Sequence, residues 1–409
     1  MPYSEEQCLQ CRDDFPSLNR MVNGRPLAYL DGPGGTQVPQ QVIDAVSEYY
    51  QRYNANAGGA FVTSVETDQM VRQARETVAA FLGAPSWREV SFGANMTTLT
   101  FALSHALGRE MAPGDEIVVT ALDHEANRGP WLNLREQGIV IKEIGLRPDA
   151  TLDPDDMARQ IGPATRLVAM GYASNAFGTV NDVALAGELT RDVGAYLVVD
   201  AVHFAPHFPL DVVALDPDFL LCSAYKFYGP HVGVLYARPG LLEQFQTDKL
   251  RVQYDEAPYC IETGTLNFAS IAGVKAAVEY LASWGKGPDL RARLVPAMED
   301  VAGYEHELAR AYFEGVSAIP GVTVWGPGFE SRLRAPTVSI TIDGVHPRDA
   351  AQRLGEQGLA VWDRDFYAAR PIEVLGLAAQ GGVIRVGISM YNTRGEIERL
   401  LNAIDALAA

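Results

Sequence analysis

The sequence predicts an α/β fold with a largely parallel sheet, and three observations support this prediction. Short apolar runs of strand length recur at residues 89–92, 116–121, 166–173, 196–199 and 219–222. Helix-like stretches such as 96–107 and 183–193 separate most of these runs. Most of the polar residues considered below follow a run directly. Alternating strands and helices form parallel sheets covered on both faces, and ligands collect beyond the carboxyl ends of such strands.

The last third of the chain predicts a second, smaller α+β domain. A long helical stretch runs with interruptions from about 271 to 318. It is followed by strands at 337–342 and 383–388, a helix near 347–357 and a final helix from about 393. A chain of 409 residues usually exceeds one core. We expect a large domain over 23–275 and a small domain formed by 1–22 and 276–409.

Composition excludes several classes of function. Hydrophobic residues make up 47% and charged residues 21% of the chain, as in an ordinary soluble globular protein. A net charge of −18 disfavours nucleic acid and anionic membrane surfaces as partners. No run has the length of a membrane span, and the start MPYSEEQCLQ lacks a signal pattern. We expect a cytoplasmic protein that acts on a small molecule.

The four cysteines form neither a disulfide framework nor a metal site. Cys8 and Cys11 make a CxxC pair, but no second pair of ligands completes a zinc site. We expect both to be plain thiols near a mobile terminus, with no metal bound. Cys222 falls in a strand pattern and is expected to be a small buried hydrophobe.

Two strands end in residues that suit pyridoxal phosphate chemistry. Asp200 ends the run 196–199, and Lys226 follows the run 219–222. A buried lysine with a depressed pKa is a good amine for a Schiff base. A carboxylate that faces a pyridinium nitrogen keeps it protonated, although Asp200 alone equally suits a turn cap. Together, the two residues indicate pyridoxal 5'-phosphate.

Three further strand ends offer partners for such a cofactor. Asn95 is a good N-cap for the helix that begins at Met96, and the free N–H groups there suit a phosphate. His124 offers an aromatic plane for the ring, and Asn175 a donor for the ring oxygen. Each alone has an ordinary structural reading, so their common position after strands carries the inference.

The ordered motifs resemble the class V aminotransferase fold group, and most of all its cysteine desulfurase and selenocysteine lyase branch. They are GAN at 93–95, DHEAN at 123–127, SNAFGT at 174–179, DAVH at 200–203 and SAYKFYGP at 223–230. The likeness spans nearly the whole chain. It implies the type I fold of pyridoxal phosphate enzymes, with a mostly parallel seven-stranded sheet and a smaller α+β domain.

The resemblance also implies roles for single residues. Lys226 would carry the cofactor and later move protons, Asp200 would pair with the ring nitrogen, and His124 would stack on the ring as a third catalytic residue. Arg385 would clamp the substrate α-carboxylate, with Asn175 near the ring and substrate. The remaining cofactor contacts would come from Ala94, Asn95, His203, Ser223, Tyr225, Gly264 and Thr265. Thr265 would reach the neighbouring subunit's phosphate, which implies a homodimer with shared active sites.

The chain departs from the desulfurase pattern at three places. Tyr225 replaces the usual histidine before the lysine, and His203 replaces a glutamine near the ring. The loop 361–370, where the desulfurases place a nucleophilic cysteine, contains none, and no cysteine follows Cys260. A persulfide relay through that loop is therefore not expected.

These departures leave a choice of reactions. We expect a cysteine desulfurase-like carbon–sulfur lyase that acts through an external aldimine, with a class V aminotransferase as the alternative. Racemisation and a non-enzymatic cofactor-binding role are further readings. Arg364, Tyr367 and Arg370 lie either in a solvated loop or at the substrate side chain, where an arginine would favour an acidic group.

Overall fold

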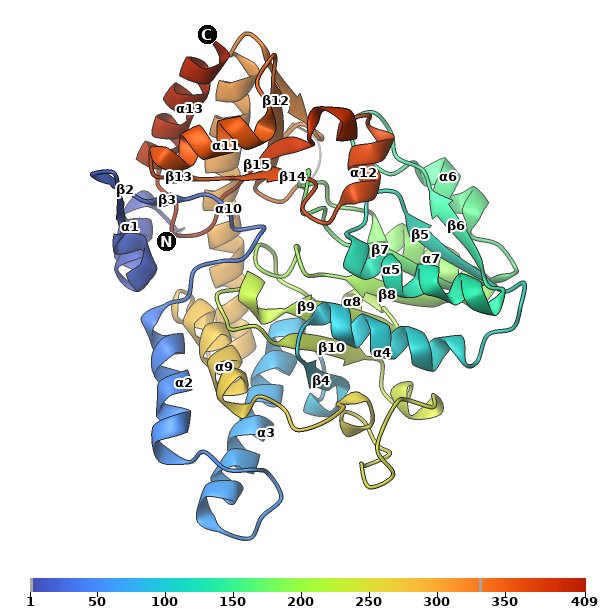
Figure 1. The fold of residues 1–409 in the computed structure, drawn as a ribbon. Coiled ribbons are helices and arrows are strands. Elements are labelled where there is room, and N and C mark those ends of the chain that lie inside the picture. The colour runs from blue at the N-terminus through green and yellow to red at the C-terminus, as the bar shows by residue number, and fades with distance from the viewer. Residues whose placement is uncertain (1–2, 331–332) are drawn as a thin grey trace.

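The protein, described here by a computed structural model over residues 3–330 and 333–409, is built around a seven-stranded sheet (Figure 1). Its strands are β4 (Val90–Gly93), β5 (Glu116–Thr120), β6 (Val140–Ile144), β7 (Thr165–Gly171), β8 (Tyr196–Asp200), β9 (Phe219–Ser223) and β10 (Gly233–Ala237). Their order is β4-β10-β9-β8-β7-β5-β6. Only β10 runs opposite to the other six strands. The predicted mostly parallel sheet is confirmed.

Helices cover both faces of this sheet, because both faces of its strands are apolar. Leu221 of β9 points into one core cluster with Leu103 of α4 (Met96–Gly108). Leu220 points into a second cluster with Ala186 of α7 (Val183–Val193). Alternation along a strand therefore buries opposite sides against different helices.

The second sheet has four antiparallel strands and lies above the first in Figure 1. Its order is β11 (Val322–Trp325), β12 (Thr337–Ile342), β15 (Val383–Gly387) and β14 (Trp362–Arg364). The helices of this half are α10 (Leu290–Ser317), α11 (Pro347–Glu356), α12 (Ala369–Val374) and α13 (Arg394–Ala408). The predicted α+β character of the last third is thereby confirmed.

Helices α2 (Gln40–Arg52), α3 (Val62–Leu82) and α9 (Phe268–Ser283) pack together beside the large sheet. Smaller elements complete the chain: α5 (Gly129–Leu132), α6 (Pro154–Gln160), α8 (Val212–Leu215), β1 (Met21–Val22), β2 (Arg25–Pro26), β3 (Ala28–Tyr29) and β13 (Leu359–Ala360). The pair β3 and β13 is parallel and joins the start of the chain to its last third. No helix of the described residues is long and apolar enough to cross a membrane.

The N-terminal cysteines correct one expectation. Residues Glu5–Asp13 form helix α1, and Cys8 and Cys11 are fully buried on it. The Cys8 thiol donates to the carbonyl of Asn392 at 3.1 Å, and the Cys11 Sγ lies 3.3 Å from the Tyr280 hydroxyl. The prediction of a mobile terminus was therefore wrong over this helix, because apolar packing outweighs the helix's polar composition.

The same contacts bear on the predicted domain boundaries. Helix α1 packs against the residues before α13, and Arg12 pairs with Glu396 at 2.8 Å. This supports the grouping of 1–22 with 276–409, which we keep as a proposal. Residues 1–2 and 331–332 of that grouping lie outside the described residues.

Candidate active site at the carboxyl ends of the parallel strands

Lys226 lies at the end of a short turn, Ala224–Lys226, that follows β9 directly. The side chain is buried, and its Nζ donates to the carbonyl of Pro33. Burial, with the nearby Arg385 charge, lowers the pKa of this amine to about 7. An amine with such a pKa is largely neutral above pH 7 and is available as a nucleophile or base.

Asp200 ends the neighbouring strand β8 and is buried as well. Burial raises the pKa of its carboxyl to about 6, while a hydrogen bond from the Val202 N–H at 2.9 Å and the Lys226 charge oppose that shift. The Val202 contact is the turn cap that the sequence also allowed. It occupies Oδ1, so the carboxylate retains acceptor capacity toward a cationic ligand.

His124 follows β5 and is held in a neutral form. Burial, with the Lys226 and Arg385 charges, lowers the pKa of the imidazole to about 3. Its Nδ1 accepts the Ala126 N–H at 3.0 Å, so the ring proton belongs on Nε2. The Tyr367 ring lies 5.7 Å from the imidazole between centroids. A fixed, uncharged aromatic plane is what stacking on a pyridine ring needs.

The start of α4 lies beside these groups. Asn95 caps the helix by accepting the Thr98 N–H at 2.9 Å, and the Met96 N–H donates to the Ser223 hydroxyl at 3.0 Å. Gly233 packs so closely that a Cβ there would lie 2.3 Å from the Asn95 backbone. The N-terminus of a thirteen-residue helix with a hydroxyl alongside suits a phosphate group.

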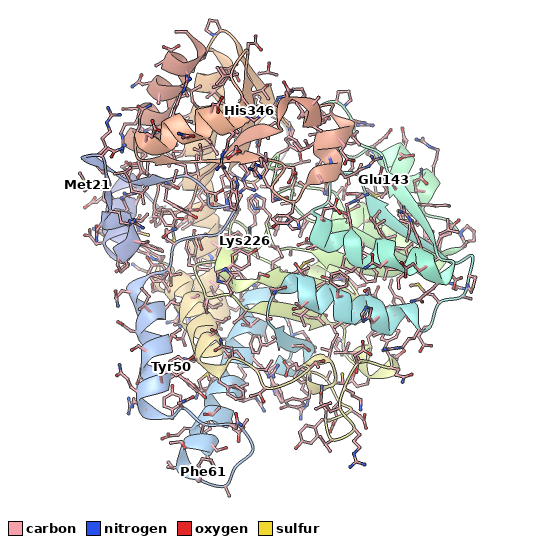
Figure 2. The ribbon with its side chains drawn as sticks, in the orientation of Figure 1. Met21, Tyr50, Phe61, Glu143, Lys226 and His346 are labelled. Atoms are coloured by element: carbon pink, nitrogen blue, oxygen red, sulfur yellow. The ribbon has the colours of Figure 1, made fainter. Side chains whose placement is uncertain are left out.

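One cavity brings most of the predicted residues together. Its lining includes Asn95, His124, Asn175, Asp200, His203, Ser223, Tyr225 and Lys226. In Figure 2, Lys226 lies centrally, between the large sheet and the C-terminal half. This cavity is where the four parallel strands β5, β7, β8 and β9 end, as expected for a sheet of this type.

Three of these lining residues have contacts that sequence could not specify. The Asn175 amide donates to the Phe366 carbonyl at 3.0 Å. His203 Nε2 lies 2.9 Å from the Thr337 hydroxyl, while its buried Nδ1 has no hydrogen-bond partner among the described residues. The Tyr225 ring stacks on His231, with centroids 4.7 Å apart. The orphaned Nδ1 of His203 is a polar atom that a bound group would satisfy.

Ala94, Gly264 and Thr265 lie elsewhere. Ala94 and Thr265 line a neighbouring hollow, and Gly264 lines neither this hollow nor the cavity. Gly264 and Thr265 are exposed. The exposed turn is fixed from behind, because the buried Glu262 pairs with Arg75 at 2.7 Å. Their roles in cofactor binding remain predictions, and those of Gly264 and Thr265 concern an adjacent subunit.

Arg385 lies on β15, almost fully buried, and is already engaged by a residue that sequence reasoning gave no role. Its Nη2 donates to Asp31 Oδ1 at 2.7 Å, and its Nη1 donates to the Asn175 carbonyl at 3.2 Å. The Phe366 ring lies 4.1 Å from the guanidinium carbon. The signal for Asp31 was present in the sequence as Asp-Gly-Pro-Gly-Gly at 31–35, a glycine-rich turn after an apolar run.

The loop 361–370 has a strained backbone and contacts Asn175, His124 and Arg385. Arg364, Phe366 and Tyr367 have φ values of 94°, 56° and 59°, which side chains other than glycine rarely adopt. Arg370 turns away to Glu143 at 2.8 Å, and Arg364 is exposed beside Asp363. No described residue of the loop lines the cavity itself. The loop meets the site through Phe366, whose ring lies against Arg385, and through Tyr367, whose ring lies near His124.

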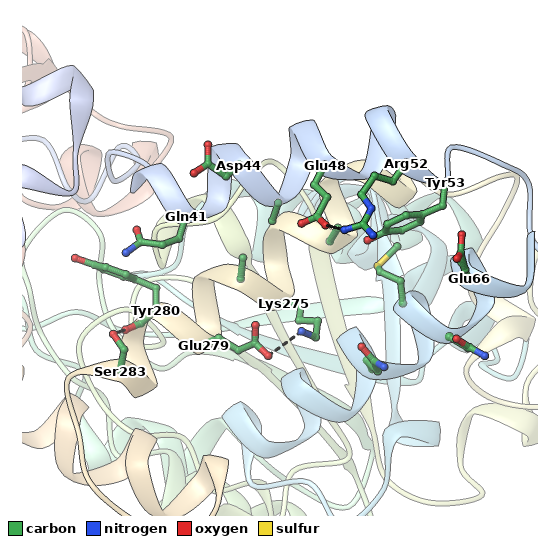
Figure 3. Close-up of a pocket in the computed structure, with 16 residues that line it drawn as sticks. Gln41, Asp44, Glu48, Arg52, Tyr53, Glu66, Lys275, Glu279, Tyr280 and Ser283 are labelled. Carbon is green, nitrogen blue, oxygen red and sulfur yellow. Dashed lines mark hydrogen bonds and ion pairs between the residues drawn. The ribbon is translucent and has the colours of Figure 1, made fainter. Parts of the chain in front are cut away.

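A wider hollow between α2, α3 and α9 has a different chemistry (Figure 3). Two pairs of its charged residues are joined along the helices, Glu48 with Arg52 at 2.6 Å and Lys275 with Glu279 at 2.8 Å. These are exposed surface pairs, which contribute little and perform no chemistry. Among the described residues, this hollow lacks the buried amine and imidazoles that line the cavity at Lys226.

Known proteins similar to this chain include cysteine desulfurases. The family model described as aminotransferase class V matches residues 28–400. A probable cysteine desulfurase of Streptomyces coelicolor is 34% identical, over 96% of this chain and 95% of its own length. A cysteine desulfurase of Serratia proteamaculans is 32% identical over 97% of both chains.

Solved structures agree with the sequence comparison. The apo structure of a cysteine desulfurase from Thermococcus onnurineus has a TM-score of 0.87 and 28% identity, covering 98% of this chain and 97% of that one. A cysteine desulfurase from Escherichia coli has a TM-score of 0.84 and 27% identity, covering 98% of each chain.

Proposed function

Because the chain belongs to the aminotransferase class V family, in the branch of the cysteine desulfurases, we propose that it is a pyridoxal phosphate enzyme that breaks the carbon–sulfur bond of a cysteine-type amino acid. The observation that carries this proposal is the buried Lys226 amine, with its pKa lowered to about 7, next to the buried Asp200 carboxyl. Neither group has an ion-pair partner within 4.0 Å among the described residues.

The residues present fit this cofactor. The helix start at Asn95 with the Ser223 hydroxyl would hold the phosphate, and the neutral His124 ring would lie against the pyridine ring. Asp200 would face the ring nitrogen, and a positive charge there would offset the burial of the carboxylate. His203, with its orphaned Nδ1, and Asn175 would lie near the ring oxygen.

Each group then has a defined task. When bound, pyridoxal phosphate supplies an electron sink for charge that develops at the substrate α-carbon. Lys226 holds the cofactor and, once released, its neutral amine takes the α-proton. Arg385 would bind the substrate carboxylate and so hold the substrate in one orientation.

Sulfur would leave without passing through a protein thiol. The loop 361–370 has no cysteine, and Cys260 is buried, with a pKa raised to about 11 by burial and nearby carboxylates. Thiolates act as nucleophiles only where their pKa is low and access is open. Direct elimination to a 2-oxo acid, ammonia and a sulfur product is the reaction that remains, with transamination as the alternative.

The test is a screen of amino acids against the purified protein with pyridoxal phosphate. We expect a visible absorbance band, covalent attachment of the cofactor to Lys226 after borohydride reduction, and release of sulfide and pyruvate from cysteine without a second substrate. A requirement for a 2-oxo acid identifies an aminotransferase. A band that no amino acid turns over identifies a binding protein instead.

The proposed assembly is a homodimer with shared sites, and its compartment the cytoplasm. Exposed apolar side chains gather near the ends of α2 and α3, where Tyr50 is 59%, Phe61 58% and Val62 69% exposed (Figure 2). Such residues are typical of protein interfaces. All four cysteines are free, which suits a reducing compartment. Mixing Lys226→Ala and Thr265→Ala chains should restore part of the activity only if sites are shared.

A further inference from the structure

We propose that Asp31 is a specificity-determining residue that makes the site select zwitterionic amino acids over 2-oxo acids. The inference rests on the proposed function in one respect, the assignment of Arg385 to the substrate carboxylate. It goes beyond that function by naming what controls access to Arg385.

The geometry of Arg385 leaves one open position. Its Nη2 is taken by Asp31 Oδ1 at 2.7 Å, whereas the buried Nε has no hydrogen-bond partner among the described residues. Nε and Nη2 form the side edge of a guanidinium, which binds carboxylates through two parallel hydrogen bonds. A substrate carboxylate on this edge must therefore share or displace the position of Asp31.

The plane of the guanidinium cannot easily move to avoid this competition. The rings of Phe366 and Trp362 lie 4.1 Å and 5.9 Å from its central carbon. Nη1 is anchored to the Asn175 carbonyl at 3.2 Å. The substrate carboxylate and Asp31 thus meet at one fixed cation.

The turn that carries Asp31 is built for this contact. A Cβ on Gly34 would lie 2.1 Å from Asp31 Oδ2, and a Cβ on Gly387 would lie 1.9 Å from Pro33. Asp31 bridges to Gly387 of β15, two residues beyond the arginine. The same turn accepts the Lys226 amine at Pro33. Asp31 therefore lies in a segment that touches both the reactive amine and the substrate arginine.

Charge balance gives the selectivity. Asp31 and Arg385 are both buried and together are neutral, and burial raises the pKa of Asp31 while lowering that of Arg385. A 2-oxo acid adds one negative charge beside Asp31, which is unfavourable in a buried site. An amino-acid zwitterion adds no net charge, and its ammonium group can pair with the displaced Asp31 carboxylate. The site therefore favours the amino acid.

The experiment compares L-alanine with pyruvate, which are both three-carbon carboxylates. Binding is measured by calorimetry on borohydride-reduced holoenzyme, whose cofactor no longer reacts with amines. For each protein, the affinity for pyruvate is divided by the affinity for alanine. We expect this ratio to be on the order of tenfold higher in Asp31→Asn than in the parent. If Asp31→Asn has the parent's denaturation midpoint and its ratio of pyruvate to alanine affinity is unchanged, the proposal is wrong.

Two controls keep the outcome interpretable. If Asp31→Asn does not fold, the parent decides, because equal affinities for alanine and pyruvate there contradict the charge argument. Arg385→Gln should weaken both ligands, and unchanged binding of both would also overturn the inference. Failure of the proposed function appears separately, as no cofactor fixed to Lys226. In that case, calorimetric titrations with alanine and pyruvate on protein not treated with borohydride still test the role of Asp31.

Discussion

Two sets of buried charges in this molecule have opposite arrangements. Arg75 of α3 and Glu262 are saturated, since Arg75 meets both carboxylate oxygens at 2.7 Å and the Phe92 N–H adds a third bond at 2.6 Å. Lys226 and Asp200 have no such mutual pairing, and burial shifts the pKa of each toward its neutral form. A saturated pair holds structure, whereas an unsaturated one is available for chemistry.

The largest effect expected from this comparison is at Lys226. Lys226→Ala should abolish turnover, because no other described group in the cavity is an amine that can hold the cofactor and take the α-proton. The fold should survive, because the substitution removes a buried amine that has no ion-pair partner among the described residues to leave behind. Activity and circular dichroism spectra of the two proteins measure this. A variant that retains full turnover contradicts the site assignment.

The pH dependence of stability sharpens the same point. Burial lowers the pKa of Lys226 to about 7 from its usual 10.5, so the unfolded chain binds more protons between these values. Stability from this group therefore rises with pH across that window, by up to about 1.4 kcal/mol per pH unit, and is flat outside it. Urea denaturation of cofactor-free parent and Lys226→Met should diverge accordingly. If the free energy of unfolding changes with pH in the same way in both proteins, the Lys226 amine is not desolvated.

Substitution in the Arg75–Glu262 pair should change the stability of the protein rather than its turnover. Glu262→Gln leaves the Arg75 charge buried without compensation, at a cost of about 3–5 kcal/mol in the free energy of unfolding. The matched control is Glu76→Gln, which removes a surface pair with Arg72 of the same helix and should change stability by less than about 1 kcal/mol. Equal losses of unfolding free energy in the two variants would show that the buried pair stabilises the fold no more than the surface pair does.

Asp200→Asn keeps the shape of the side chain and removes its charge. We expect turnover to fall on the order of 10²-fold, since carbanion stabilisation depends on a protonated ring nitrogen. Cofactor binding and the denaturation midpoint should change little. If Asp200→Asn has the parent's turnover rate, the Asp200 carboxylate serves only to accept the Val202 N–H in the turn.

The smallest effect is expected at Cys260. Cys260→Ala should leave sulfide release from cysteine unchanged within about twofold, because the thiol is buried and its pKa is raised to about 11. Cystine and a 2-oxo acid are assayed in parallel. Loss of sulfide release with the cofactor still bound would restore a persulfide mechanism with a relocated cysteine.

Sequence predicted the parts of the site that follow local rules. Strand ends carry polar residues over a short stretch of chain, so the positions of Asp200 and Lys226 at strand ends could be predicted from pattern alone. Strands β6 and β10 were not identified. Lys142 and Glu143 make β6 look polar because it is an edge strand, and β10 is a short run directly after the lysine loop.

The parts of the site that were missed depend on contacts between distant segments. Asp31 and Arg385 are separated by 354 positions and meet only because Asp31 bridges to Gly387. The inward turn of Phe366 instead of Arg364 or Arg370 depends on positive φ values in the loop. Neither a tertiary register nor a strained backbone leaves a periodic signal in the sequence.

The pairing of Asp31 with β15 also sets an order of assembly during synthesis. The groups of the cavity that are proposed to hold the cofactor lie between Asn95 and Lys226 and can come together once the large sheet has formed. The arginine arrives only with β15, near the end of the chain, and until then the Asp31 carboxylate lacks its partner. Contacts of such long sequence separation form late. A nascent chain should therefore gain its cofactor-binding half before its means of holding an amino acid.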